Sequence, residues 1–189
     1  MGFGTLLFGY FAMYAFSLSP YYFFADIIGS FVAVYALSKL ADYSRWFGLA
    51  MYGALGFLIA SGVNAVSLLF GLYPMGEGIV WTIVELLKLA AGCVFHIWLF
   101  LGVRTVAERA GQKKLREKGM RRLVATSVYF AAAAVTMLLA PFLPDQTGQV
   151  ISMAVLLYWV ICLFMNLLLL YGCFANIIPA DADMSVKSW

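Results

Sequence analysis

The sequence contains few charged residues, and this scarcity excludes most classes of water-soluble protein. Only 11% of its 189 residues are charged and 65% are hydrophobic, whereas about 25% of the residues in an ordinary soluble domain are charged. The mean hydropathy is +0.94. A soluble domain of this size buries only about 70% of its unfolded surface and needs a polar exterior. A soluble enzyme, a disordered chain and a disulfide-stapled secreted domain are therefore excluded, and a polytopic membrane protein remains.

The sequence also lacks the residue patterns of familiar metal, cofactor and catalytic sites. It has one histidine, His96, and three isolated cysteines with no CxxC pair, so neither a zinc site nor a haem pair is expected. It contains no GxSxG, no HExxH and no glycine-rich phosphate loop, the patterns that mark common hydrolases, metalloproteases and nucleotide sites. We therefore expect no metal and no cofactor.

Six apolar segments have the length of membrane-spanning helices or come close to it. A helix needs about 20 apolar residues to cross the roughly 30 Å hydrocarbon core. The segments lie at residues 2–18, 21–40, 46–72, 79–103, 123–143 and 150–178. Small and polar residues recur at helical spacing on each segment, which is typical of helices that pack together in lipid. The sequence thus predicts an all-α membrane protein, a single domain over residues 1–189 formed by a compact bundle of six transmembrane helices.

The basic residues predict the orientation of these helices. Eight of the twelve lysines and arginines lie between residues 104 and 122, and short loops rich in such residues stay in the cytoplasm. With six spans, both termini then lie in the cytoplasm. The compact layout and the absence of an Asn-x-Ser/Thr acceptor indicate a bacterial cytoplasmic membrane. The eight basic residues are Arg104, Arg109, Lys113, Lys114, Arg116, Lys118, Arg121 and Arg122.

This basic loop, residues 104–122, is expected to lie against the bilayer surface. Each base near anionic lipid headgroups contributes about 1 kcal/mol of attraction. Docking of a cytoplasmic protein partner is the second interpretation of the same loop. A nucleic acid is not expected as a partner, because no aromatic residue interleaves the bases and base stacking needs aromatic platforms.

Polar side chains inside the predicted spans are the candidate functional groups. An ionised group at mid-membrane costs roughly 2.5–3.5 kcal/mol on insertion scales, so it needs a partner or water. A helix rises about 1.5 Å per residue, and this rise sorts the polar residues into two layers. The outer layer, predicted to bind a ligand, comprises Asp26, Asn64, Glu85, Lys88 and Thr136. The inner layer comprises His96, Asn166 and Tyr129.

Two interpretations of the outer layer stay open. Glu85 and Lys88 are three residues apart and can meet on one helix face, which favours a self-neutralising pair that locks the bundle. If Asp26 joins them, the cluster has one excess negative charge, and a cavity open to the exterior would attract a cation or retain a proton. For His96, a hydrogen bond to Asn166 or to a backbone carbonyl is one interpretation, and a proton relay is the other.

Three functional hypotheses follow. The first is a small transporter, or the solute-binding subunit of one, that uses the outer layer to bind a small solute or cation. Its six spans and cytoplasmic termini resemble those of the solute-binding subunits of vitamin-type uptake transporters, in size and topology alone. The second is an accessory or scaffold subunit whose polar stripes only pack. The third is an intramembrane enzyme, for which the sequence offers no catalytic constellation.

Overall fold

The computed structural model describes residues 2–15, 22–70 and 79–177, and these residues form helices and turns without any strand. The predicted all-α class is therefore confirmed. Within these residues, six α-helices follow one another, and a short 3-10 helix, η1, separates the last two. Their bounds are α1 Gly2–Ala15, α2 Tyr22–Leu40, α3 Arg45–Leu69, α4 Ile79–Arg109, α5 Lys113–Leu139, η1 Ala140–Phe142 and α6 Asp145–Asn176.

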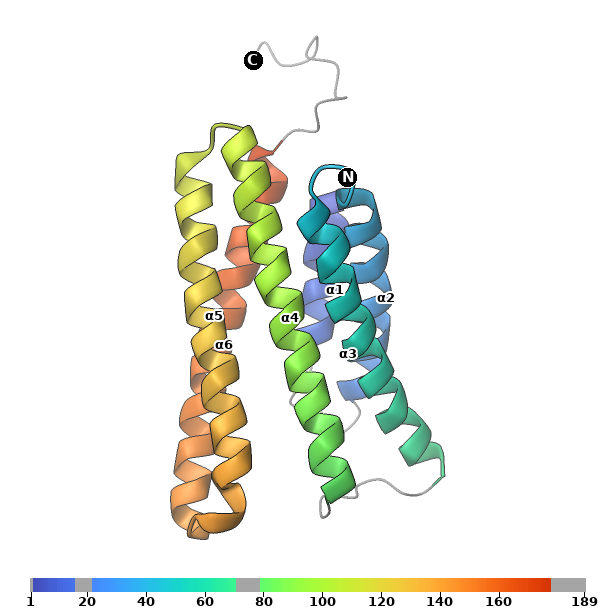
Figure 1. Cartoon of the computed structure of the whole chain (residues 1–189), viewed down its shortest axis with the longest axis vertical. Coiled ribbons are helices and arrows are strands. Elements are labelled where there is room, and N and C mark those ends of the chain that lie inside the picture. Colours follow the sequence, from blue (N-terminus) through green and yellow to red (C-terminus); the bar gives the residue numbers. More distant parts are fainter. Residues whose placement is uncertain (1, 16–21, 71–78, 178–189) are drawn as a thin grey trace.

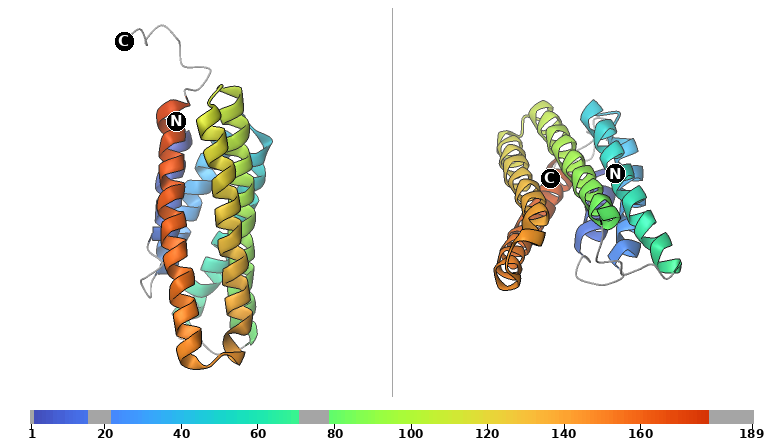
Figure 2. Two further views of the ribbon diagram at one scale, coloured as in Figure 1. Left: turned by 90° about the vertical axis from the view of Figure 1, so that its left-hand side faces the viewer. Right: turned by 60° about the horizontal axis from the view of Figure 1, so that its bottom comes forward.

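The helices run alternately up and down and form a ring (Figure 1). Each helix packs against its neighbours in the sequence, and α6 closes the ring by packing against α1. One end of the bundle carries the start of α1, the α2–α3 turn, the α4–α5 turn and the end of α6, as Figure 1 and the left view of Figure 2 show. We call this the basic end, because every lysine and arginine of the described residues except Lys88 lies toward it.

Four of the helices are long and apolar enough to cross a membrane. These segments are Arg45–Ser67, Thr82–Arg109, Lys113–Phe142 and Asp145–Asn176. By contrast, the 14 residues of α1 extend only about 21 Å, short of the roughly 30 Å hydrocarbon core. The predicted span ends at residues 18, 72 and 178, and the predicted start at residue 21, lie outside the described residues.

The sequence predicts the basic stretch, residues 104–122, as a cytoplasmic loop that could be helical, although Gly111 and Gly119 weaken the helical alternative. Most of it is helical, because α4 continues to Arg109 and α5 already begins at Lys113. The reversal occupies only three residues and depends on Gly111, whose φ of 68° is in the left-handed region that glycine adopts without strain. The bases are therefore held on two adjacent helix ends rather than on a flexible connection.

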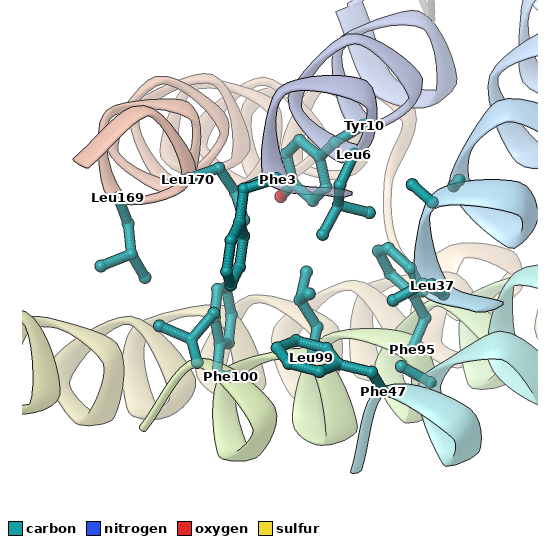
Figure 3. Close-up of a cluster of buried hydrophobic side chains, with 14 of the residues drawn as sticks. Phe3, Leu6, Tyr10, Leu37, Phe47, Phe95, Leu99, Phe100, Leu169 and Leu170 are labelled. Atoms are coloured by element: carbon teal, nitrogen blue, oxygen red, sulfur yellow. The ribbon is translucent and has the colours of Figure 1, made fainter. Parts of the chain in front are cut away.

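The largest buried side chains gather in the half of the bundle nearest the basic end. Figure 3 shows residues of α1, α2, α3, α4 and α6 pointing toward one another there. Leu6, Leu37, Phe47, Leu99 and Phe100 have no exposed surface. This core fixes the relative positions of the helices on which the polar residues lie.

Glycines allow two helix pairs to approach closely. A Cβ atom on Gly29 of α2 would lie 2.8 Å from the carbonyl oxygen of Gly9 on α1. On α3, a Cβ atom on Gly53 would lie 2.5 Å from the backbone nitrogen of Phe95 on α4. Such backbone contacts are the usual means of association between helices in lipid, where no hydrophobic force drives them together.

The ends of α5 and α6 that lie farthest from the basic end contain no buried residues, unlike the rest of the bundle. Between Phe130 on α5 and Trp159 on α6, every residue is described and none is buried. We call residues 131–158 the distal hairpin. Figure 2 shows it extending away from the other helices at the end opposite the basic end.

Candidate functional site

Lys88 forms a buried ion pair with Asp26. The Lys88 Nζ atom lies 2.5 Å from Asp26 Oδ2, and both side chains are more than nine-tenths buried. Ser61 Oγ donates a second hydrogen bond to the same carboxylate oxygen at 3.3 Å. The ion pair joins α2 to α4, two helices that are not neighbours in the sequence. It neutralises two charges that would otherwise be costly in an apolar interior.

Glu85 forms its hydrogen bond with an amide instead of with a cation. Asn64 Nδ2 donates to Glu85 Oε1 at 3.2 Å, and no described residue forms a salt bridge with Glu85. The direct Glu85–Lys88 pair considered in the sequence analysis is therefore not the arrangement found. Lys88 pairs instead with Asp26 of α2, whose carboxylate lies at the same level of the bundle.

We refer to Asp26, Ser61, Asn64, Glu85 and Lys88 as the acid–lysine cluster. With both carboxylates ionised and the ammonium protonated, it carries one negative charge in excess, and that charge belongs to Glu85, whose side chain is half-buried. Asn64 is fully buried, and its Oδ1 atom has no hydrogen-bond partner among the described residues. The cluster thus presents an uncompensated carboxylate and an unsatisfied acceptor.

A cavity of about 240 Å³ opens beside this cluster. Asp26, Glu85 and Lys88 line it from α2 and α4, and Ala133 and Met137 line it from α5. Most of the remaining lining is aromatic. We call these residues the aromatic wall: Tyr14, Phe57, Tyr129, Phe130 and Trp159.

The rings of the aromatic wall contact one another in a continuous series. The ring centroid of Tyr14 lies 5.3 Å from those of Phe57 and Trp159. Tyr129 stacks on Trp159 with a centroid separation of 4.4 Å, and Phe130 lies 5.1 Å from Tyr129. Offset and edge-to-face contacts at these distances are the favourable geometries of aromatic pairs. The wall is therefore a packed surface rather than a set of independent side chains.

A second polar group, the tyrosine–histidine network, lies deeper toward the basic end. His96 Nε2 lies 2.8 Å from the Tyr10 hydroxyl, and His96 Nδ1 lies 2.7 Å from the Gly92 carbonyl oxygen. Asn166 Nδ2 donates to Tyr10 Oη at 2.9 Å and to Thr126 Oγ1 at 3.2 Å. The network joins α1, α4, α5 and α6.

These contacts assign the protons of the network. Because the Gly92 carbonyl can only accept, His96 Nδ1 carries the hydrogen. Because Asn166 donates to the Tyr10 oxygen, the Tyr10 hydroxyl is free to donate to His96 Nε2. Both ring nitrogens of His96 have a hydrogen-bond partner, and its contacts are those of a structural histidine hydrogen-bonded to a carbonyl.

The structure brings four of the five outer-layer residues together and leaves one apart. Asp26, Asn64, Glu85 and Lys88 form one cluster, whereas the Thr136 hydroxyl donates to Ala132 O of its own helix. Thr136 does not line the cavity described above. Of the inner-layer residues, His96 and Asn166 meet through Tyr10, whereas Tyr129 belongs to the aromatic wall.

Sequence reasoning missed several residues of this region. Ser61 carried a usable signal, because it lies three residues before Asn64 and therefore shares its helix face. Tyr129 of the aromatic wall was among the predicted inner-layer residues. The sequence carried no signal for Tyr10, Tyr14, Phe57 and Phe130, since aromatic residues make up 17% of the chain and their spacing does not distinguish inward from outward faces.

At the basic end, the arginines make few contacts with other elements. Arg109 donates to the carbonyl oxygen of Tyr43 at 2.6 Å, and Arg116 lies 3.4 Å from Glu108 in an exposed ion pair. Arg104, Arg116 and Arg121 line a shallow surface depression together with Glu117 and Met120. Such exposed ion pairs contribute little to stability, so most of the basic charge stays available to the surroundings.

No group of three or more His, Cys, Asp or Glu residues that could hold a metal ion occurs in ranges 2–15, 22–70 and 79–177. Comparison of the chain with protein-family models, curated proteins and solved structures found no match.

Proposed function

We propose that the chain is an integral membrane protein whose six helices all cross the bilayer, with both termini in the cytoplasm. Four helices have the length and composition of membrane spans, and α1 and α2 run antiparallel beside them in the same ring (Figure 1). The concentration of lysine and arginine at one end of the bundle supports a cytoplasmic location for that end. There the exposed bases would contact anionic headgroups, and we propose a bacterial cytoplasmic membrane.

We further propose that the cavity is a solute site and that the protein is a small transporter or the solute-binding subunit of one. One observation carries the proposal: Asp26, Glu85 and Lys88, all unfavourable in an apolar bundle, line the same cavity. A purely structural lock needs only the Asp26–Lys88 pair. Glu85 adds a charge that no described residue neutralises, and ionisable residues within membrane helices typically mark a solute or ion pathway.

Thiol labelling of reconstituted protein tests this proposal. In a variant whose native cysteines, Cys93, Cys162 and Cys173, are replaced by alanine, Ala133→Cys places a thiol in the cavity. Val135→Cys, two residues along the same helix, is the matched control, because Val135 is 54% exposed on the surface that would face lipid. We expect a membrane-impermeant maleimide to label Ala133→Cys at least tenfold faster than Val135→Cys, and only from the side opposite the basic end.

The scaffold hypothesis is the second candidate, and the distal hairpin favours it. Residues 131–158 expose apolar side chains that no other part of the described chain covers, as expected for a surface that contacts lipid or another membrane subunit. A scaffold needs no water-accessible cavity. Equal and slow labelling of Ala133→Cys and Val135→Cys would therefore favour the scaffold and reject the solute site.

A further inference from the structure

We infer that the cavity recognises a small organic cation, a substituted ammonium rather than a metal ion, an anion or a neutral solute. This inference rests on the solute site proposed above and names its ligand class. It follows from three features of the lining: its charge, its aromatic surface and its size.

The first feature is the charge. The Lys88 ammonium pairs with Asp26 at 2.5 Å, and no other cation of the described ranges forms a salt bridge with Glu85. An anion would meet the Glu85 carboxylate directly and would need to break the Asp26–Lys88 pair to find a counter-charge. A neutral solute would remove water from Glu85 and supply no positive charge in its place. Leaving a carboxylate without water or a counter-charge is costly in a low-dielectric site. A cation supplies the missing partner.

The second feature is the aromatic wall. An ammonium within about 6 Å of a ring centroid is attracted by the negative face of the ring, and aromatic cages are the usual recognition sites of substituted ammonium groups. Lys88 provides an internal example, because its Nζ atom lies 4.8 Å from the centroid of Phe57, a member of the wall. The chain therefore already combines an ammonium, a carboxylate and a ring at this place.

The same wall disfavours a metal ion. Calcium binds six to eight oxygen ligands, and magnesium prefers six in octahedral geometry. The cavity offers the carboxylates of Asp26 and Glu85, of which Asp26 is bonded to Lys88 and Ser61, and most of the rest of its surface is carbon. A cation that carries its own apolar shell, such as an alkylammonium, matches a surface with five rings and one carboxylate, Glu85, whose charge no described residue neutralises.

The third feature is the size. About 240 Å³ is less than the roughly 300–1,000 Å³ of pockets that hold drug-sized ligands. The cavity therefore fits a compact head group of a few heavy atoms. Tetramethylammonium is the simplest probe of this kind, and two probes of similar branched shape but different charge are available: tert-butanol, which is neutral, and pivalate, which is an anion.

Calorimetric titration of the full chain in lipid nanodiscs tests the inference. We expect tetramethylammonium to bind at least tenfold more tightly than tert-butanol or pivalate. Glu85→Gln keeps the side-chain shape and an oxygen acceptor for Asn64, and we expect it to weaken tetramethylammonium binding at least tenfold. Glu108→Gln, on the same helix but at the basic end, is the matched control and should leave binding unchanged.

The outcomes separate this inference from the function on which it rests. If Ala133→Cys is labelled but the three probes bind equally, or none binds, the cation preference is wrong and the solute site stands. If Ala133→Cys is not labelled, the solute site itself is wrong. Should Glu85→Gln fail to fold, the comparison of the three probes on the unmodified chain still decides the ligand class.

Discussion

Helices α3 and α4 differ from the α5–α6 pair in a way that reverses the usual link between hydropathy and burial. Each of these helices contains an apolar window of 18 residues, and the windows of α5 and α6 have mean hydropathies of 2.0 and 2.5, against 1.6 and 1.9 for those of α3 and α4. Yet only 11% and 28% of the α5 and α6 windows are buried inside the protein, against 39% and 44% for those of α3 and α4. The more apolar windows are the less enclosed ones.

This difference follows from the two solvents that a membrane helix meets. High hydropathy measures how well a helix tolerates acyl chains, whereas close packing needs small residues and paired polar groups. Gly53 and the acid–lysine cluster hold α2, α3 and α4 together, and the distal hairpin has no comparable contact with the other helices. The hairpin therefore has the composition of a lipid-facing surface, and the first four helices have that of a packed interior.

The largest effect that separates these regions is expected at the buried ion pair. Lys88→Met leaves Asp26, which is 1% exposed, without its counter-charge, and breaking a buried pair in this way costs about 3–5 kcal/mol. We expect the free energy of unfolding, measured by SDS titration with tryptophan fluorescence, to fall by this amount. The double variant Lys88→Met/Asp26→Asn should recover at least half of the loss.

Asp145→Asn at the start of α6 is the control for that experiment. Asp145 is exposed at the tip of the distal hairpin, so its replacement should change the unfolding free energy by less than about 0.5 kcal/mol. If Lys88→Met lowered the free energy of unfolding by less than about 1 kcal/mol, the Asp26–Lys88 pair would not stabilise the packing of the first four helices.

A leucine comparison sharpens the same contrast with an uncharged side chain. Leu99 on α4 is fully buried and Leu138 on α5 is 56% exposed. Leu99→Ala leaves a cavity in the core and should lower the free energy of unfolding by about 2–5 kcal/mol. Leu138→Ala should lower it by less than about 0.5 kcal/mol. Equal losses at the two positions would show that the distal hairpin is enclosed in the native assembly.

The smallest expected effects come from added methyl groups. At Gly29, a Cβ atom would meet the backbone of α1, so Gly29→Ala must separate two helices and should cost about 1–3 kcal/mol. At Gly148 in the distal hairpin, the nearest atom is Leu143 Cβ at 3.9 Å, so Gly148→Ala should change stability by less than about 0.5 kcal/mol. A neutral Gly29→Ala would contradict the close α1–α2 contact.

The sequence predicted the helical class and much of the polar grouping, for a definite physical reason. Inside lipid, each ionisable residue must have a partner, so Asp26, Glu85 and Lys88 could be expected to lie together. Their pairing could not be read from spacing, because an i,i+3 relation between Glu85 and Lys88 competes with a cross-helix contact that depends on the relative height of α2 and α4. The six-span topology and its orientation remain predictions.

Two features were beyond the reach of sequence reasoning. The helical extension of residues 104–122 was obscured by Gly111 and Gly119, of which only Gly111 interrupts the helix. The aromatic wall combines residues of four helices, α1, α3, α5 and α6, and no local pattern marks which rings share a surface. In a membrane helix, apolar periodicity does not tell inward faces from outward ones, because lipid and the protein interior accept the same side chains.

The hydrogen bonds around Tyr10 constrain how the nascent chain reaches its final form. Tyr10 is synthesised before its partner Asn166, which lies 156 positions later on α6. Until α6 has been made, the hydroxyl of α1 has no access to the amide of α6. Closure of the ring therefore waits for α6, and a chain truncated before α6 would leave the Tyr10 hydroxyl without the Asn166 amide.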